Sequence, residues 1–389
     1  MLSRDLIWHS IPISLRELNL SKVLICGQAF RWKINPAHQN ITNSSVKIWS
    51  STLQSHIIFL KQTADSLHYS SYPPFTDVKD LHNLIHDYFQ LNISLDALYK
   101  TWSEADPNFK TKSQGSFEGV RMLRQDPFET LISFICSSNN NIKRISMMCE
   151  NLCLNYGSLI GEVDNVKYHS FPTVEQLASQ GSALDSQLRQ LGFGYRANYI
   201  YSTCELIHSS NHDISALRQV SYTEANQSLL QYKGIGPKIA DCICLMALDK
   251  PATIPVDTHV FQIAKRDYKM KLKGEAVNKG NYGVIAQNFQ EKWGEYAGWA
   301  QTVMFAADLK ALGDGIVKVK KETDVNVEKV ITLKRELEVE IKEEINEKDQ
   351  KLIMEAVKVE DLGTSIEEVE YYNNGRPKRK RRVVIKSEI

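Results

Sequence analysis

The sequence predicts an α+β protein with an N-terminal antiparallel β-sheet domain, a mostly helical second region and a charged C-terminal tail. Residues 1–114 alternate short apolar runs with turn residues, and residues 115–313 carry apolar side chains at helical spacing. Residues 314–389 are dense in Glu and Lys with few aromatic residues. A chain of 389 residues has room for two or three domains, and a hydrophobic content of 42% is ample for a buried core.

Composition limits the environment in which the chain works. No apolar run approaches membrane-spanning length, and the N-terminus lacks a signal-peptide pattern, so we expect no membrane partner. The seven cysteines are odd in number and lie mostly among apolar residues. This favours buried thiols in a reducing compartment over disulfides. The net charge of +1 averages over the charged tail and does not argue against a nucleic-acid partner.

The N-terminal region is expected to form strands flanked by a few helices. Short apolar runs bounded by polar turns predict strands at residues 46–50, 56–61 and 66–70. Helical spacing predicts helices at residues 81–90 and 94–102. The strands follow one another closely, which is typical of an antiparallel sheet.

The region from 115 to 313 is expected to be helical, with Gly and Pro turns between its elements. Apolar spacing predicts helices at residues 117–123, 128–137, 142–156, 174–179 and 197–209. Two more helices, joined by a tight hairpin, are expected within residues 224–248, and another at 258–266.

The hairpin is the most informative stretch, with the sequence Tyr-Lys-Gly-Ile-Gly-Pro-Lys-Ile-Ala-Asp-Cys at residues 232–242. Gly234 and Gly236 can adopt backbone angles closed to other residues, and Pro237 suits the first turn of a helix. The free N–H groups of that turn can hold a phosphate, so such a hairpin grips a nucleic-acid backbone without reading its sequence. We expect the backbone contacts at Gly234, Gly236 and Ile239. Gly-x-Gly alone is also compatible with an ordinary turn between helices.

Two ionisable residues make this stretch more specific. Lys238 stands at the start of the second helix, and Asp257 follows it in Ile-Pro-Val-Asp-Thr-His at residues 254–259. A hairpin, a lysine at the helix start and a following Pro-Val-Asp resemble the helix-hairpin-helix DNA glycosylase superfamily. The resemblance to its lyase-type branch implies that Lys238 is the nucleophile and Asp257 its partner. Asp257 is also an expected N-cap of the next helix, a role compatible with catalysis.

Another segment, Leu-Ile-Cys-Gly-Gln-Ala-Phe-Arg-Trp at residues 24–32, is by itself only a glycine turn followed by an aromatic strand. It resembles the part of eukaryotic 8-oxoguanine DNA glycosylases that reaches the lesion pocket. The resemblance implies that the Gly27 carbonyl accepts a hydrogen bond from N7–H of the oxidised base. Normal guanine has a bare acceptor at that position. Since an unmet polar group costs about 1–3 kcal/mol on burial, this one contact would discriminate between the bases.

The pocket is completed, on the same resemblance, by three more side chains. Gln301 would contact the Watson–Crick edge of the flipped base and Phe305 its face, although the residues alone indicate a helix with one polar edge. Cys242 lies on the same helix face as Lys238. The resemblance suggests that these two form a thiolate–ammonium pair in the pocket, and a plain buried cysteine is the alternative.

Two loop segments resemble the loops with which the same family contacts the DNA opposite the lesion. Asn139 begins a run of three asparagines that favours a turn, and Tyr195 and Arg196 lie in a glycine-rich turn before a helix. The resemblance implies that Asn139 fills the space left by the extruded base and that Tyr195 wedges into the stack. It also implies that Arg144 and Arg196 contact the orphaned cytosine, and that His259 binds a phosphate beside the lesion. Taken alone, the segments are helix–loop–helix turns and His259 is a surface histidine.

The cysteine pattern separates branches of the superfamily. Endonuclease III and adenine-excising relatives carry a four-cysteine iron–sulfur motif after the hairpin, and this chain has no cysteine after Cys244. Alkylation-repair glycosylases usually lack the hairpin lysine, whereas Lys238 is present. Lys233 stands before the first hairpin glycine, where a proline is common in this family, and should add a phosphate contact. We expect no cofactor and no iron–sulfur cluster, and allow for a monovalent or divalent cation on the hairpin carbonyls.

The expected function is a bifunctional base excision repair enzyme. It would excise 8-oxoguanine, and formamidopyrimidine, opposite cytosine in duplex DNA by a lysine Schiff base, and nick the strand by β-elimination. The alternatives are the same chemistry on another oxidised purine and a non-catalytic lesion-binding scaffold, against which the presence of both Lys238 and Asp257 argues. We expect a monomer that binds duplex DNA containing oxidised guanine, with downstream repair proteins as further partners.

The tail from residue 314 has mixed charge of the kind found in solvated, disordered segments. It ends in a basic cluster at residues 376–382, Arg-Pro-Lys-Arg-Lys-Arg-Arg. Such a cluster indicates nuclear import, with nonspecific binding to polyanions as the alternative. Because the resembling family acts on DNA, we expect a nuclear protein and allow for a mitochondrial pool.

Overall fold

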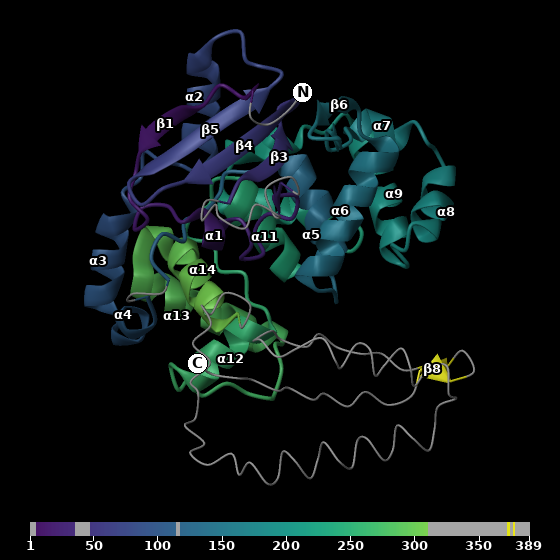
Figure 1. The fold of residues 1–389 in the computed structure, drawn as a ribbon. Helices are drawn as coiled ribbons and strands as arrows, with labels where there is room; N and C mark the ends of the chain where they lie inside the picture. The colour runs from purple at the N-terminus through teal and green to yellow at the C-terminus, as the bar shows by residue number, and fades with distance from the viewer. Residues whose placement is uncertain (1–4, 36–46, 114–116, 310–371, 374–375, 378–389) are drawn as a thin grey trace, which may run out of the picture. The chain divides into compact units, whose positions relative to one another are not determined.

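The computed structural model describes residues 5–35, 47–113, 117–309, 372–373 and 376–377. Met1–Gly315 form one compact unit and Ile316–Ile389 a second. The first unit combines an antiparallel sheet with a mostly helical body, which confirms the predicted fold class (Figure 1). The proposed boundary between residues 114 and 115 lies inside this unit and stays a prediction.

The sheet has five strands in the order β1-β5-β4-β3-β2, with every neighbouring pair antiparallel. Both of its faces are buried: Ile58 and Leu60 pack in one apolar cluster with the helix α2, while Ile57 and Phe59 pack in another with the β6–β7 hairpin. The period of two along β4 produces this division. The strands are β1 (His9–Pro12), β2 (Lys33–Ile34), β3 (Trp49–Leu53), β4 (His56–Gln62), β5 (Ser66–Tyr72), β6 (Leu159–Val163) and β7 (Val166–His169).

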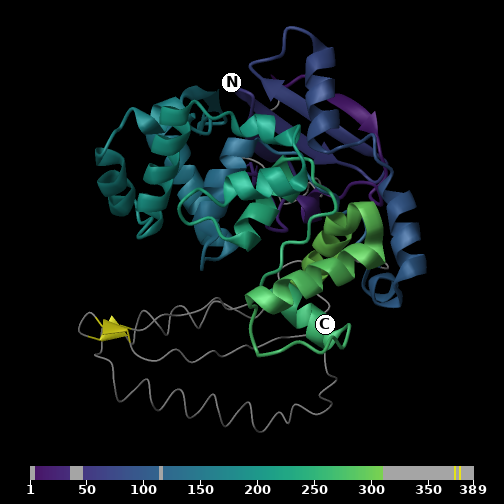
Figure 2. The same cartoon turned by 180° about the vertical axis from the view of Figure 1, so that it is seen from behind.

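The helices pack mainly around one large apolar cluster, which also receives Cys26 and Phe30 from the segment between β1 and β2. Helix α11 lies within this cluster and is buried from Ile239 to Ala247. Views from opposite sides show α3 and α4 beside the pair α13 and α14 (Figures 1 and 2). The helices are α1 (Leu20–Val23), α2 (Val78–Tyr88), α3 (Leu95–Ala105), α4 (Pro107–Ser113), α5 (Pro127–Ser137), α6 (Ile142–Tyr156), α7 (Val174–Ala178), α8 (Ala183–Gln190), α9 (Arg196–Ser210), α10 (Tyr222–Leu229), α11 (Pro237–Ala247), α12 (Thr258–Arg266), α13 (Lys279–Trp293) and α14 (Ala297–Asp308), with 3-10 turns η3 (Ile214–Arg218) and η4 (Gly294–Tyr296).

Most predicted elements are present, with shifted ends. The strand expected at 46–50 begins at Trp49, while α6 has the predicted bounds. The edge strand β1 was not predicted, because it has four residues and ends in Pro12, too few for a period of two to show. The aromatic strand expected after the Gly27 turn is wrong for residues 28–32, which are not a strand; the two-residue β2 begins only at Lys33. The β6–β7 hairpin and helices α4, α8 and α13 were also not predicted.

The helix expected at 117–123 is wrong. That segment is not helical, and Gly119 has a φ of 79°. Its backbone bonds to other parts of the chain: the N–H of Leu123 donates to the Gln28 side chain, and the Gly119 carbonyl accepts from Asn19. Apolar side chains at 120, 122 and 123 are buried from this non-helical path, and their spacing imitates a helix.

The structure tests the predictions about the cysteines and the charged tail only in part. All seven cysteines are free and buried, as expected. Within the described ranges, no helix is both long and apolar enough to cross a membrane. Of the second unit, the structure describes only the antiparallel pair β8 (Tyr372–Asn373) and β9 (Arg376–Pro377). The predicted disorder of the tail and most of its basic cluster at 376–382 lie outside the described residues.

Candidate active site

The hairpin between α10 and α11 is held by one glycine of special conformation. Gly234 has a φ of 86°, and a Cβ atom added there would overlap the ring of Tyr199. Gly236 differs, because its φ of −101° is open to other residues and an added Cβ would meet nothing within 4 Å. Of the two glycines that can adopt backbone angles closed to other residues, Gly234 therefore does so and Gly236 does not. Gly236 is the N-cap of α11, followed by Pro237 at its first position.

Lys238 lies half-buried in the first turn of α11, against helix α5. Its Nζ atom is 5.2 Å from the centroid of the Phe134 ring, a cation–π contact. Cys242, one turn later, is buried with 3% exposure. Burial raises the pKa of the Cys242 thiol to about 11, although the charge and hydrogen bond of Lys238 act in the opposite direction. The predicted pair is therefore in contact, and burial favours its neutral thiol form.

Asp257 caps helix α12, as expected, and its Oδ1 accepts a hydrogen bond from the Val260 N–H at 2.9 Å. The carboxylate is half-buried and its negative charge acts on Cys242, raising the pKa of that thiol. Lys238 acts on the same thiol with the opposite sign. The amine of Lys238 and the carboxylate of Asp257 come from separate helices and act electrostatically, with opposite signs, on the same buried thiol.

Gly27 faces two helices. Its φ is 88°, and an added Cβ would lie 3.2 Å from Ile142 Cδ1 and 4.0 Å from Phe305 Cε1. Phe305 in turn makes an edge contact with the His259 ring, with centroids 5.6 Å apart. Gln301 lies one turn before Phe305 on α14 and is 7% exposed. The structure therefore brings Gly27, Phe305 and His259 together from three distant parts of the sequence.

Two glutamines that the sequence analysis did not single out hold the Gly27 loop. Gln28 is 1% exposed; its Nε2 donates to the Arg121 carbonyl at 3.0 Å, and its Oε1 accepts from the Leu123 N–H at 2.9 Å. The side chain of Gln125 donates to the Gln28 carbonyl at 2.7 Å. A long polar residue inside the apolar run Cys26–Trp32 was the available signal, since such a residue is buried only with partners.

The loop residues expected to contact the opposite strand also converge. Asn139 is exposed with a φ of 45°, and Tyr195, 45% exposed, donates its hydroxyl to the Ser138 carbonyl at 3.0 Å. Arg196 is 3% exposed; its guanidinium stacks on the Tyr195 ring at 4.5 Å and donates to the carbonyls of Ser138 and Asn139. Arg144 is exposed and donates to the Gly192 carbonyl at 3.1 Å.

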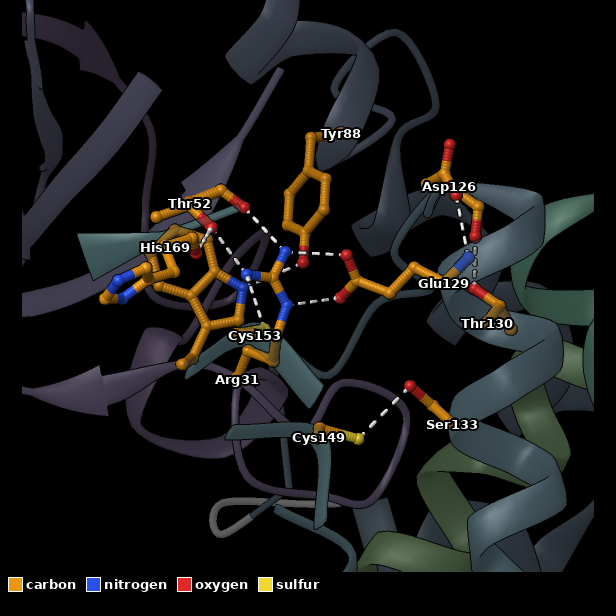
Figure 3. Close-up of polar contacts among 11 residues, drawn as sticks. Arg31, Thr52, Tyr88, Asp126, Glu129, Thr130, Ser133, Cys149, Cys153 and His169 are labelled. Carbon is orange, nitrogen blue, oxygen red and sulfur yellow. Dashed lines mark hydrogen bonds and ion pairs between the residues drawn. The ribbon is translucent and has the colours of Figure 1, made fainter. Parts of the chain in front are cut away.

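A separate ion pair fastens the sheet to the helical body (Figure 3). The Arg31 guanidinium binds both carboxylate oxygens of Glu129 on α5, at 2.8 and 2.6 Å, and donates to the Thr52 carbonyl on β3 at 2.8 Å. Burial lowers the pKa of Arg31, but the Glu129 carboxylate more than offsets this and keeps it charged. A cleft of about 810 Å³ is lined in part by these residues and by none of the predicted site residues. The ion pair therefore fixes α5, whose Phe134 lies beside Lys238.

Metal binding has no support from side chains. Within the ranges that the structure describes, no group of three or more His, Cys, Asp and Glu residues could hold a metal ion. In the hairpin, the Tyr232 carbonyl accepts from the Ile235 N–H at 3.1 Å. The expected cation on the hairpin carbonyls is not tested by these contacts and stays a prediction.

Comparison with known proteins places these features in a family. Residues 10–131 match the model of the 8-oxoguanine DNA glycosylase N-terminal domain, and residues 132–281 match the HhH-GPD superfamily of base excision DNA repair proteins. The chain is 36% identical to the N-glycosylase/DNA lyase of Saccharomyces cerevisiae, covering 86% of this chain and 97% of that protein. It is also 36% identical to the N-glycosylase/DNA lyase OGG1 of Arabidopsis thaliana, covering 84% of this chain and 89% of that protein.

Solved structures agree with this assignment. The 8-oxoguanine glycosylase/lyase of Clostridium acetobutylicum, bound to double-stranded DNA with cytosine opposite 8-oxoguanine, superposes with a TM-score of 0.64 at 26% identity. The superposition covers 75% of this chain and 91% of the Clostridium acetobutylicum chain. A structure of MBOgg1 with a low-affinity DNA ligand gives a TM-score of 0.67 at 26% identity, over 77% of this chain and 94% of that one. With both domain models matched in order and relatives matched over nearly their whole length, the chain belongs to the 8-oxoguanine DNA glycosylase family of N-glycosylase/DNA lyases.

Proposed function

We propose that this protein excises 8-oxoguanine opposite cytosine from duplex DNA, with Lys238 as nucleophile and Asp257 as its carboxylate partner, and then nicks the strand as an abasic-site lyase. The family assignment supports the reaction class. What supports the residue assignment is that the Lys238 amine and the Asp257 carboxylate both act on the buried Cys242 thiol, which lies one turn after Lys238 on α11. A lesion-binding scaffold would require neither the amine nor the carboxylate.

The reaction begins with extrusion of the damaged nucleotide, because the glycosidic bond is inaccessible inside a duplex. Unstacking costs a few kcal/mol, which pocket contacts and inserted side chains offset. Asn139 and Tyr195 are suited to insertion, since both are exposed at loop positions that the Ser138 and Asn139 carbonyl contacts hold in place. Gly234, Gly236 and Ile239 of the hairpin would hold the backbone phosphates at the end of α11.

The base would be recognised beside Gly27 and Phe305, which lie close together. The Gly27 carbonyl would accept N7–H of 8-oxoguanine, Phe305 would pack on the base, and Gln301 would meet its Watson–Crick edge. Formamidopyrimidine is a second expected lesion. His259 lies against Phe305, its side chain is 51% exposed, and its Nδ1 is 3.6 Å from a carboxylate oxygen of Asp308. The exposed part of the ring would bind a neighbouring phosphate.

The covalent step uses the amine of Lys238 in its neutral form. Its nitrogen attacks the anomeric carbon, the bond from that carbon to the base breaks, and the departing base takes the electron pair and a proton. The sugar opens to a Schiff base, and loss of a proton from the adjacent carbon expels the 3′ phosphate by β-elimination. Asp257 stabilises the positive charge that develops on the sugar and assists proton transfer.

Recognition of the opposite cytosine falls to Arg144 and Arg196, whose N–H donors fit the O2 and N3 acceptors of cytosine. Arg144 is already exposed. Arg196 donates to the Ser138 and Asn139 carbonyls, so contact with cytosine requires it to redirect one of these donors. We propose nuclear localisation from the basic cluster at 376–382, with a mitochondrial pool allowed for, and no organic or iron–sulfur cofactor.

Borohydride trapping tests the nucleophile. Native protein with an 8-oxoguanine:cytosine duplex should form a covalent adduct when borohydride reduces the Schiff base, and Lys238→Gln should not. Lys233→Gln is the matched control, because this exposed hairpin lysine bonds to Asn198 and carries the same charge close to the same DNA. At saturating protein, the control should trap like the native chain. Trapping of Lys238→Gln at the native level would overturn the assignment.

A further inference from the structure

The helix that carries Lys238 also carries a buried carboxylate that the proposed mechanism does not use. Asp241 is 3% exposed and lies one turn after Lys238 on α11. Its Oδ1 accepts hydrogen bonds from the Tyr222 hydroxyl and the Asn226 amide, both at 2.8 Å. Its Oδ2 accepts from the Tyr282 hydroxyl at 2.5 Å. The carboxylate thus joins α10, α11 and α13 at one point.

This arrangement is unusual because all its partners are uncharged. Among the described residues Asp241 has no basic partner, and burial raises its pKa while the three donors act against that rise. Burial and the carboxylate also raise the pKa values of Tyr222 and Tyr282, so both hydroxyls keep their protons and donate. A carboxylate without a cation is expensive to bury, and a well-packed apolar residue would make a more stable fold.

Tyr282 has a second contact that Tyr222 lacks. Its hydroxyl accepts a hydrogen bond from the Val256 N–H at 3.3 Å while donating to Asp241. Val256 is 1% exposed and immediately precedes Asp257. One hydroxyl group therefore links the helix that carries the amine to the segment that carries the carboxylate, two parts of the site that otherwise belong to separate helices.

We propose that Asp241 and Tyr282 are positioning residues that set the separation and orientation of Lys238 and Asp257. This inference rests on the proposed roles of those two residues. The Asp241 carboxylate fixes the Tyr282 hydroxyl, and the hydroxyl fixes the Val256 amide and with it the N-cap of α12. A displacement of about 1 Å in a reacting group can slow a reaction about 100-fold. Loss of the one hydrogen bond between Tyr282 and Val256 is therefore sufficient to change the rate of excision.

Two tyrosine variants form a matched pair for the test. Tyr282→Phe and Tyr222→Phe each remove one hydroxyl donor from Asp241, but only Tyr282→Phe also removes the contact with Val256. The single-turnover rate of base excision should be measured with excess full-length protein on an 8-oxoguanine:cytosine duplex. Affinity for a duplex with a tetrahydrofuran abasic-site analogue and thermal unfolding should be measured on the same samples.

Tyr282→Phe is expected to slow excision about tenfold or more, while its affinity for the analogue stays within about twofold of native. Tyr222→Phe keeps the contact with Val256, so it is expected to lose less stability than Tyr282→Phe and to stay within about twofold of the native rate. A purely structural role predicts equal rates for the two variants. A ratio of the two rates below about threefold would overturn the proposal, and a larger ratio supports it.

Two more variants complete the test, one as a substitute for Tyr282→Phe and one to test the nucleophile separately. Asp241→Asn places an N–H donor against one of its present donors and should slow excision like Tyr282→Phe, so it carries the same rate comparison if Tyr282→Phe does not fold. Lys238→Gln separates the two levels of the proposal. If Lys238→Gln traps like the native chain, the proposed nucleophile is wrong. If Lys238→Gln fails to trap and Tyr282→Phe excises at the native rate, only the positioning role is wrong.

Discussion

Helix α11 and the two loops that carry Asn139 and Tyr195 belong to the same compact unit but are held in different ways. Helix α11 is buried from Ile239 to Ala247, and the carboxylate of its Asp241 accepts hydrogen bonds from α10 and α13. The loops expose their functional side chains and are held by donors that reach backbone carbonyls, while Asn139 adopts a φ of 45°. One region is built to hold atoms in place and the other to meet a ligand.

The difference teaches where function can be separated from stability. Substitutions around α11 should change the rate of the chemical step, because small displacements there move the reacting groups. Substitutions in the loops should change which base is tolerated opposite the lesion, with the chemical step largely intact. Two residues break this division: Asp257 caps α12 with the same carboxylate that would act in the reaction, and Arg196, beside Tyr195, is buried.

The largest effect is expected for Asp257→Asn. Asparagine caps helices about as well as aspartate, so the free energy of unfolding should change by less than about 0.5 kcal/mol. The charge that would stabilise the sugar is lost, and the single-turnover excision rate should fall about 100-fold. Asp126→Asn, at the equivalent cap of α5, is the control and should leave the rate unchanged. A native rate in Asp257→Asn would remove the carboxylate from the mechanism.

The next effect concerns the Gly27 loop. Gln125→Leu leaves the buried Gln28 carbonyl without its donor, which should destabilise the loop by about 1–3 kcal/mol. Because Gly27 directly precedes Gln28, competition between 8-oxoguanine:cytosine and guanine:cytosine duplexes should show reduced preference for the lesion. Gln290→Leu is matched, since Gln290 on α13 makes the same kind of contact with the Ala252 carbonyl at 3.0 Å. Equal preference in both variants would show that Gln125 does not position the loop.

A smaller effect distinguishes the two arginines. Arg144→Ala should weaken discrimination for cytosine opposite the lesion by about 1–3 kcal/mol and leave thermal unfolding unchanged, because Arg144 is exposed. Arg196→Ala should weaken discrimination and also lower stability, since the Asn139 carbonyl loses its donor and the Ser138 carbonyl keeps only the Tyr195 hydroxyl. Excision rates with each of the four bases opposite the lesion provide the measurement. Unchanged discrimination in both variants would show that neither arginine recognises the opposite cytosine.

The smallest effect is the pH dependence from Cys242. Its pKa is raised from 9.0 to about 11, so the stability that its neutral form contributes is complete below pH 9 and is lost as pH rises through 11. By pH 10 the loss should be about 1 kcal/mol relative to Cys242→Ala, measured by denaturant unfolding at pH 8 and pH 10. Stability that instead rises with pH in this window would indicate a thiolate in the folded protein.

Local patterns were sufficient where the determinants are local. The turn of asparagines, the cap at Asp257 and the Gly-x-Gly hairpin each depend on neighbouring residues, and α6 and α12 have the predicted bounds. The resemblance supplied the set Gly27, Phe305 and His259, whose proximity no spacing reveals. That these three lie together is visible only in the structure.

Long-range hydrogen bonds account for what the sequence did not show. Val120 to Leu123 follow a helical apolar spacing, but the Gln28 side chain holds their backbone in a non-helical path. Nothing in the sequence singles out Asp241, because its partners Tyr222 and Tyr282 lie 19 and 41 residues away. Partners more than a dozen residues away leave no periodic signal.

The most direct test of the central assignment is to identify the residue that carries the trapped sugar. After borohydride reduction of the complex with an 8-oxoguanine:cytosine duplex, nuclease and protease digestion followed by mass spectrometry should place the deoxyribose adduct on Lys238 alone. An adduct on the exposed Lys233, or on the N-terminal amine, would contradict the assignment of Lys238 as the nucleophile.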